Sequence, residues 1–178
     1  KYLIFTFDTD LIMLSHLRME GKFIEIHPGQ SDSRYAHVIF VLKDGRRLCY
    51  DDSRQFGKME LATRATYLKT KSLQNVGPEP FVIDANEYYK KIKNRTTPIK
   101  STLLDQKLMS GLGNIYVDEV LYLSKVHPLT PTNMVSKETV KVLIKNSIDV
   151  LNEAIKAGGT TVRSYAPAAG ISGNFQQK

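Results

Sequence analysis

Two glycines and an asparagine form the first group of residues whose types and spacing could do chemistry. Gly111, Gly113 and Asn114 lie between two amphipathic runs, within the segment LLDQKLMSGLGNIYVDEVL at residues 103–121. Glycines let the backbone approach another group closely, and the start of a helix presents unpaired N–H groups and the positive end of its dipole. The pattern therefore predicts a phosphate-binding turn between two helices. Capping of the second helix is the alternative role for Asn114.

The charge balance favours a polyanionic partner. The 178 residues include 25 Lys and Arg against 18 Asp and Glu, which gives a net charge of +7 and a pI near 9.4. Residues 71–178 carry 14 basic and 9 acidic side chains, or +5, whereas residues 1–70 carry 11 and 9, or +2. A nucleic acid is the first candidate for such a partner, and the second half of the chain is the more basic.

Cysteine and histidine usage argues against a bound metal. Cys49 is the only cysteine, so this stretch can form neither an intrachain disulfide nor a thiolate zinc site. His16, His27, His37 and His127 come with no second cluster of nitrogen or sulfur ligands, so we expect no metal. No apolar run approaches the roughly 18–20 residues of a membrane span, and no leader is visible. We expect a reducing cytoplasm and no membrane partner.

The first third of the sequence predicts β structure. Short runs rich in Ile, Val, Phe and Tyr are separated by turn formers, a pattern typical of a sandwich. The expected strands are residues 2–7, 12–17, 22–26, 37–42 and 47–51. Asp44-Gly45, between the last two strands, supplies the positive φ angles of a type I′ turn, so we expect a hairpin there.

The rest of the sequence predicts a linker followed by helices. Pro78 and Pro80 close a polar stretch that begins at Thr66, and neither a helix nor a sheet continues through two prolines. Beyond them the periodicity becomes helical, with expected helices at residues 85–93, 99–109, 115–123 and 137–157. Ser136 is suited to cap the last helix and Gly158-Gly159 to end it.

The two-helix segment resembles the helix-two-turn-helix of the bacterial formamidopyrimidine-DNA glycosylases. Four further blocks agree with that family in the same order: KYL at residues 1–3, SHLRMEG at 15–21, DSRQFG at 52–57 and GGTTVR at 158–163. Five spaced blocks in one order are far more specific than a lone motif. The resemblance implies an α+β fold, in which an antiparallel β-sandwich precedes a helical domain and damaged duplex DNA is the partner.

The resemblance also implies domain ranges and two segments that we expect outside the chain. The ranges are an incomplete β-sandwich at 1–68, a linker at 69–82, the helical domain at 83–158 and a lesion-capping loop at 159–178. Family members begin with Pro-Glu, whose proline amine attacks the damaged nucleotide with the glutamate as acid/base, and they end in a four-cysteine zinc finger. We expect the first upstream of Lys1 and the second beyond Lys178, so zinc belongs to the full-length parent and no cofactor to this chain.

The resemblance assigns roles to single residues. Lys1 corresponds to a catalytic lysine that meets a phosphate beside the lesion and assists strand cleavage; a solvated strand-end lysine is the alternative. DNA contacts are implied for His16, His37, Arg54, Arg95, Lys100 and Asn114. Without the resemblance, both histidines would be ordinary strand-edge residues. Thr96 stands where the family often has a lysine, and Arg95 or Lys100 could supply that charge.

Met19, Arg54 and Phe56 match the three residues that fill the void left by the damaged nucleotide. Flipping a base out costs about a few kcal/mol of stacking and pairing. Phe56 can wedge into the stack, Met19 can adapt to an irregular void, and the Arg54 fork can meet the opposite base. Packing of Met19 and Phe56 in a core is the alternative.

Lesion recognition is implied for Glu20, Ile115, Arg163 and Ser164. The last two belong to the loop that closes over the flipped base in the family. Residues 166–169, APAA, are more apolar than the family pattern, a departure that bears on lesion preference.

The function implied by the resemblance is base-excision repair of oxidised purines, such as 8-oxoguanine and formamidopyrimidines, by a monomer in the bacterial cytoplasm at the nucleoid. The full-length parent would be a DNA glycosylase with AP lyase activity. This chain by itself would bind DNA with little or no catalysis. One alternative is the sister branch that removes oxidised pyrimidines, which has no LRME run after the histidine. Another is a non-catalytic nucleic-acid-binding module.

Overall fold

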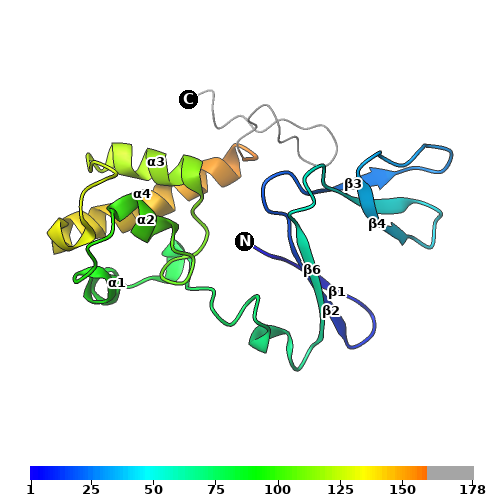
Figure 1. Cartoon of the computed structure of the whole chain (residues 1–178), viewed down its shortest axis with the longest axis horizontal. Coiled ribbons are helices and arrows are strands. Elements are labelled where there is room, and N and C mark those ends of the chain that lie inside the picture. Colours follow the sequence, from blue (N-terminus) through cyan, green and yellow to red (C-terminus); the bar gives the residue numbers. More distant parts are fainter. Residues whose placement is uncertain (160–178) are drawn as a thin grey trace. The chain divides into compact units, whose positions relative to one another are not determined.

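The computed structural model describes residues 1–159 and divides the chain into two compact units (Figure 1). One unit is built on Lys1–Leu68 and contains the strands. The other is built on Lys69–Lys156 and contains the α-helices. Among the described residues, no helix is both long and apolar enough to cross a membrane.

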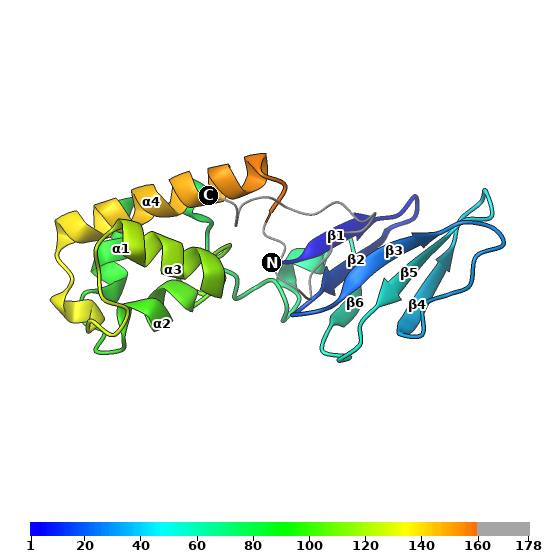
Figure 2. The same ribbon diagram turned by 90° about the horizontal axis from the view of Figure 1, so that it is seen from above.

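The β unit consists of two three-stranded antiparallel sheets (Figure 2). In the first sheet, β2 (Leu11–His16) lies between β1 (Leu3–Thr6) and β6 (Lys58–Thr63). In the second sheet, β5 (Arg47–Asp51) lies between β3 (Lys22–Ile26) and β4 (Ala36–Val41).

Aromatic side chains join the two sheets. The ring of Phe23 on β3 lies 5.1 Å from that of Phe5 on β1, edge to face, and 5.5 Å from that of Tyr50 on β5. Residues 12–14 of the central strand β2 are all buried. A strand covered on both faces needs a continuous apolar run in place of alternation. The expected β-sandwich is therefore confirmed.

The hairpin expected at Asp44-Gly45 is confirmed, but its expected turn type is wrong. Strands β4 and β5 pair, and the Leu42 N–H donates to the Arg46 carbonyl at 2.8 Å. Gly45 has a φ of 84°, whereas Asp44 does not have the positive φ that a type I′ turn requires. The Gly45 N–H donates to the Leu42 carbonyl at 3.1 Å. The result is a three-residue loop with the glycine in the left-handed region.

Strand β6 forms where the sequence predicts no strand. Its residues Lys-Met-Glu-Leu include good helix formers and are weak strand formers. Pairing with β2 nevertheless runs from Lys58 opposite His16 to Thr63 opposite Leu11. Tertiary pairing with a buried central strand therefore overrides the local preference.

The helical unit contains α1 (Ala85–Ile92), α2 (Ile99–Leu104), α3 (Asn114–Leu123) and α4 (Lys137–Lys156). Short 3-10 turns lie at Tyr67–Lys69, Pro80–Val82 and Thr132–Met134. Each α-helix contributes a fully buried side chain to the core: Ile92, Leu103, Val117 and Leu143. Helix α4 packs against both α1 and α3, so the unit has one shared core.

Local hydrogen bonds define the ends of the longest helix. The Ser136 hydroxyl accepts from the Thr139 N–H at 3.1 Å, which confirms the expected cap of α4. Gly158 and Gly159 follow its last turn with φ values of 72° and 91°, a conformation that glycine adopts with little strain and that ends helices.

Helix α2 ends at Leu104, well before the expected end at Met109. The Asp105 carboxylate accepts from the Lys107 N–H at 3.1 Å. The Asp105 carbonyl accepts from the N–H groups of Leu108 and Met109 at 2.9 and 3.2 Å. A side chain that bonds the backbone two residues on favours a turn over a continuing helix. Residues 105–109 therefore form a separate turn ahead of the glycines.

Candidate nucleic-acid interface

Met19, Arg54 and Phe56 lie together on the surface of the β unit; we call these three side chains the tip. The Arg54 guanidinium carbon lies 4.6 Å from the centre of the Phe56 ring, and Arg54 Nη1 lies 3.7 Å from the Met19 sulfur. Met19 is 64% exposed and Phe56 is 50% exposed. The alternative that these two residues pack in the core is therefore wrong for this structure. Water-exposed apolar groups around a guanidinium are suited to enter a gap in a base stack.

Two loops carry the tip and contact each other beside it. Met19 lies in the loop between β2 and β3, and the other two tip residues lie between β5 and β6. The Ser53 hydroxyl of the second loop donates to the Glu20 carboxylate of the first. Glu20 therefore lies beside the tip in the structure, and its expected role in lesion recognition stays a prediction.

His37 has a hydrogen bond within the β unit. Its Nε2 lies 2.8 Å from the carbonyl oxygen of Asp52, at the start of the loop that carries Arg54. His37 is the second residue of β4, and Asp52 follows directly after the neighbouring strand β5. His37 therefore contacts the first residue of the tip loop, and a direct contact of His37 with DNA stays a prediction.

His16 ends β2 with one ring nitrogen occupied. The Arg18 N–H donates to its Nδ1 at 3.0 Å, and the Tyr2 ring meets the imidazole edge-on at 4.8 Å between centroids. Burial lowers the pKa of His16 below its usual 6.5, and the positive charges of Arg18 and the Lys1 side chain lower it further. The side chain is therefore neutral at pH 7 and can offer its Nε2–H as a donor.

At pH 7, His16→Ala is expected to weaken duplex binding about 10- to 150-fold, because a hydrogen bond to a charged phosphate contributes about 1.5–3 kcal/mol. His16→Gln should keep most of the affinity, because its amide also offers an N–H. Fluorescence anisotropy with a labelled duplex measures both. If His16→Gln binds as weakly as His16→Ala, and wild-type binding strengthens steeply from pH 7.5 to 6, the imidazolium is the binding form instead.

Lys1 lies two residues before β1, close to His16. Lys1 as a whole residue is exposed. Partial burial of its side-chain amine lowers the pKa of that amine below the usual 10.5. The structure therefore puts a lysine and a histidine in the same neighbourhood, an arrangement that suits a phosphate. The catalytic role of Lys1 stays a prediction.

A glutamine organises the turn between α2 and α3. Gln106 Nε2 donates to the Leu112 carbonyl at 2.9 Å, and its Oε1 accepts from the Gly111 N–H at 3.2 Å. Gly111 has a φ of 100°, which only glycine adopts without strain. The predicted two-turn connection is present, and Gln106 is a residue that sequence reasoning missed.

Asn114 is the first residue of α3, and its expected alternative as the helix cap is wrong. The N-cap residue is Gly113, with an extended φ and ψ of −121° and 179°. Asn114 and Ile115 are both exposed on the first turn. The unpaired N–H groups of this turn and the Asn114 amide are therefore accessible to an anion.

The two predicted cations of the helical unit are both in ion pairs. Arg95 Nη1 lies 3.1 Å from Asp105 Oδ2, and Lys100 Nζ lies 2.7 Å from Asp118 Oδ1. Partly exposed pairs of this kind contribute about 0–1 kcal/mol. A phosphate can therefore replace either carboxylate at small cost.

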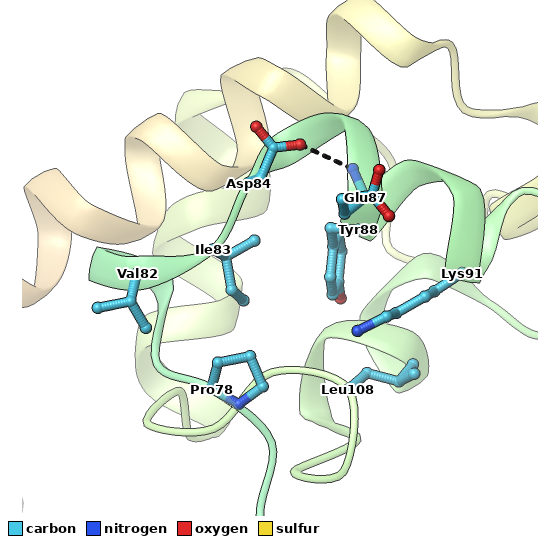
Figure 3. A pocket seen from close by; sticks show the side chains of 8 residues that line it. All are labelled: Pro78, Val82, Ile83, Asp84, Glu87, Tyr88, Lys91 and Leu108. Atoms are coloured by element: carbon cyan, nitrogen blue, oxygen red, sulfur yellow. Dashed lines mark hydrogen bonds between the residues drawn. The ribbon is translucent and has the colours of Figure 1, made fainter.

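A cavity of about 160 Å³ lies elsewhere in the helical unit (Figure 3). Its lining residues are Pro78, Val82, Ile83, Asp84, Glu87, Tyr88, Lys91 and Leu108. None of the predicted DNA-binding residues lines it. The Tyr88 side chain points between Ile83 and Lys91 (Figure 3), and its buried hydroxyl has no hydrogen-bond partner among residues 1–159. Burial raises the pKa of Tyr88 well above its usual 10.

Tyr88→Phe is expected to stabilise the helical unit by about 1 kcal/mol, because a buried hydroxyl without a partner costs about 1–3 kcal/mol of desolvation. Thermal melting should show a rise of about 4–8 °C in the transition of this unit, given its size. Tyr89→Phe, on the neighbouring partly exposed residue, is the matched control and should leave the melting temperature unchanged. A fall for Tyr88→Phe would show that its hydroxyl makes a stabilising interaction.

Arg163 and Ser164 lie outside the described residues. Within residues 1–159, no group of three His, Cys, Asp or Glu side chains could hold a metal ion.

Two further residues of the β unit were given no role by sequence reasoning. Tyr50 and Asp52 are buried beneath the tip, and the Tyr50 hydroxyl donates to Asp52 Oδ2 at 2.8 Å. The available signal was the pair of glycines, Gly21 and Gly57, that close the two tip loops. Glycines at loop ends indicate a close approach by another group.

Comparison with known proteins agrees with this arrangement. The protein-family model for the formamidopyrimidine-DNA glycosylase N-terminal domain matches residues 1–59. The family model for the H2TH (helix-two-turn-helix) domain of the same enzyme matches residues 76–166. The formamidopyrimidine-DNA glycosylase of Ligilactobacillus salivarius is 47% identical over 180 residues, and that of Mycoplasma mobile is 43% identical over 176 residues. Each match covers 99% of this chain and 64% of the relative.

Solved structures of the same enzyme also match this chain. Lactococcus lactis Fpg in complex with DNA containing an abasic site matches with a TM-score of 0.91 at 38% identity. Its G226P mutant in complex with DNA containing Fapy-dG matches with a TM-score of 0.92 at 37% identity. Both matches cover 99% of this chain and 65% of the other. The chain thus spans slightly less than two thirds of the proteins it matches, and with two domain models and close relatives in agreement it belongs to the formamidopyrimidine-DNA glycosylase family.

Proposed function

We propose that this chain binds damaged duplex DNA and places its tip in the gap left by a missing or flipped-out base. The observation that carries the proposal is the exposed cluster of Met19, Arg54 and Phe56. An apolar wedge with a guanidinium replaces part of the stacking and pairing that the orphaned base has lost. On an intact duplex the same insertion requires a base pair to open first, so a ready-made gap is the preferred site.

The phosphate contacts that we propose come from both units. In the β unit, His16 and Lys1 supply a donor and a cation. In the helical unit, the first turn of α3 with Asn114 offers N–H groups, and Arg95 and Lys100 offer charge. Such contacts position a duplex and carry no sequence information.

For the full-length protein we propose excision of oxidised purines with AP lyase activity. The relatives are named formamidopyrimidine-DNA glycosylases, and one related structure holds DNA containing Fapy-dG. The LRME run at residues 17–20 favours the purine branch of the family. Excision assays on duplexes with an oxidised purine or an oxidised pyrimidine separate the two branches.

The test for the chain itself is a binding titration with two duplexes of one sequence. One contains a tetrahydrofuran abasic-site analogue and the other is intact. We expect at least about tenfold tighter binding to the first, because the intact duplex must lose about a few kcal/mol of stacking and pairing. Equal affinities would refute the proposed function.

A further inference from the structure

Tyr50 and Asp52 form a buried hydrogen-bonded pair beneath the tip. Asp52 is 1% exposed, and its carboxylate accepts three hydrogen bonds. Oδ2 accepts from the Tyr50 hydroxyl at 2.8 Å and from the Gly57 N–H at 2.9 Å, and Oδ1 accepts from the Arg54 N–H at 3.1 Å. Burial alone would raise the pKa of Asp52, but these hydrogen bonds outweigh it and lower the pKa. One charged carboxylate therefore holds both ends of the loop that carries Arg54 and Phe56.

The Tyr50 hydroxyl also lies against the end of each tip loop. A Cβ atom on Gly57 would overlap that oxygen, and a Cβ atom on Gly21 would lie 2.5 Å from it. Gly57 closes the loop of Phe56 and Gly21 closes the loop of Met19. One hydroxyl group thus packs against two loops that are more than thirty residues apart in the sequence.

Both loops contain a strained residue next to the tip. Arg18 and Gln55 have φ values of 57° and 56°, a left-handed conformation that is unfavourable for residues with a side chain. Such residues persist only where the surrounding structure holds them, and they concentrate at functional sites. Arg18 precedes Met19, and Gln55 separates Arg54 from Phe56, so the strain lies at the tip itself.

We propose that Tyr50 and Asp52 are positioning residues that hold Met19, Arg54 and Phe56 in one preformed arrangement and so set the preference for gapped over intact DNA. The inference rests on the proposed function. Neither residue has to touch the DNA, because both are buried and act through the loop backbones. A tip that is already ordered loses less conformational freedom on binding than one that must assemble. Loosening the pair should therefore weaken binding most where the tip inserts.

The experiment is Tyr50→Phe, which removes only the hydroxyl, with Tyr35→Phe on an exposed tyrosine of the same unit as the matched control. The readout is the ratio of the dissociation constants for intact and abasic-site duplex. Partial unfolding lowers both affinities by the same factor, so the ratio reports on the tip even if the variant is less stable. We expect Tyr50→Phe to reduce the ratio about fivefold and Tyr35→Phe to leave it unchanged.

A double-mutant cycle with Phe56→Ala separates positioning from general stability. If the pair acts through the tip, Tyr50→Phe should cause little further loss of the ratio once Phe56 is absent. An unchanged ratio in Tyr50→Phe, or an equal loss with and without Phe56, would overturn the inference. Absence of any preference in the wild-type chain would instead overturn the proposed function, so the two failures are distinct.

Discussion

Replacing Phe56 with alanine is expected to reduce the preference for abasic-site DNA over intact DNA roughly 5- to 150-fold. Stacking of a base on an aromatic ring contributes about 1–3 kcal/mol, and that contact is available only where the stack is open. The Phe56 ring is half exposed and lies under the Arg54 guanidinium, so its removal also leaves Arg54 less well placed. Paired titrations with the intact and the abasic-site duplex measure the change.

Phe7→Ala is the matched control for Phe56→Ala. Phe7 is another partly exposed phenylalanine of the β unit. Its backbone N–H donates to Leu11 and its carbonyl accepts from Arg64, so alanine at this position keeps both hydrogen bonds. The control should keep the preference of the wild type. If Phe56 were a core residue, its loss would cost about 3–5 kcal/mol of stability. A large fall in melting temperature with an unchanged preference would support that reading and contradict ours.

Raising the salt concentration from about 50 to about 200 mM is expected to weaken duplex binding roughly 40- to 150-fold. Each neutralised phosphate contributes about −0.9 to the slope of log affinity against log salt, and we propose three or four such contacts, from Lys1, Arg95, Lys100 and the start of α3. The same dependence should hold for intact and abasic-site DNA, because phosphate contacts do not read the lesion.

Lys100→Ala tests one of these contacts directly. It should make the salt slope shallower by about 0.9, whereas Lys145→Ala should leave it unchanged. The control is well matched, because Lys145 is also paired with an aspartate, Asp149, at 2.6 Å on its own helix. Asp118→Asn, which frees Lys100, should strengthen binding to both duplexes. A slope near zero in the wild type would contradict the phosphate contacts as a group.

The sequence predicts the β unit well where strands carry their own pattern. The runs at residues 22–26 and 47–51 have the expected bounds, since each is flanked by turn formers. Residues 58–63 have no such pattern and become a strand only because β2 offers a partner along its whole length. The hairpin was predictable from Asp-Gly, but loop length decides the turn type, and strand pairing sets that length.

The three tip residues were predictable from the family resemblance. The buried residues that hold the two tip loops in place were not. The spacing of Met19, Arg54 and Phe56 matches the family, and their positions on the surface agree with it. Tyr50 reads as an ordinary strand residue in the sequence, and Asp52 follows that strand as the first residue of the DSRQFG block with no role of its own. Their importance depends on contacts between loops distant in the chain, which no local pattern encodes. The ion pairs of Arg95 and Lys100 are hidden from the sequence for the same reason.

Photo-crosslinking tests the central claim most directly, because it asks whether the tip touches the orphaned base. A duplex carries 5-iodouracil opposite a tetrahydrofuran site, and trypsin and mass spectrometry then locate the crosslink. We expect it in the peptides of residues 19–22 or 55–58, which contain Met19 and Phe56. The yield should fall strongly when 5-iodouracil is paired with adenine in an intact duplex. Crosslinks confined to other peptides, or equal yields from the two duplexes, would contradict the account.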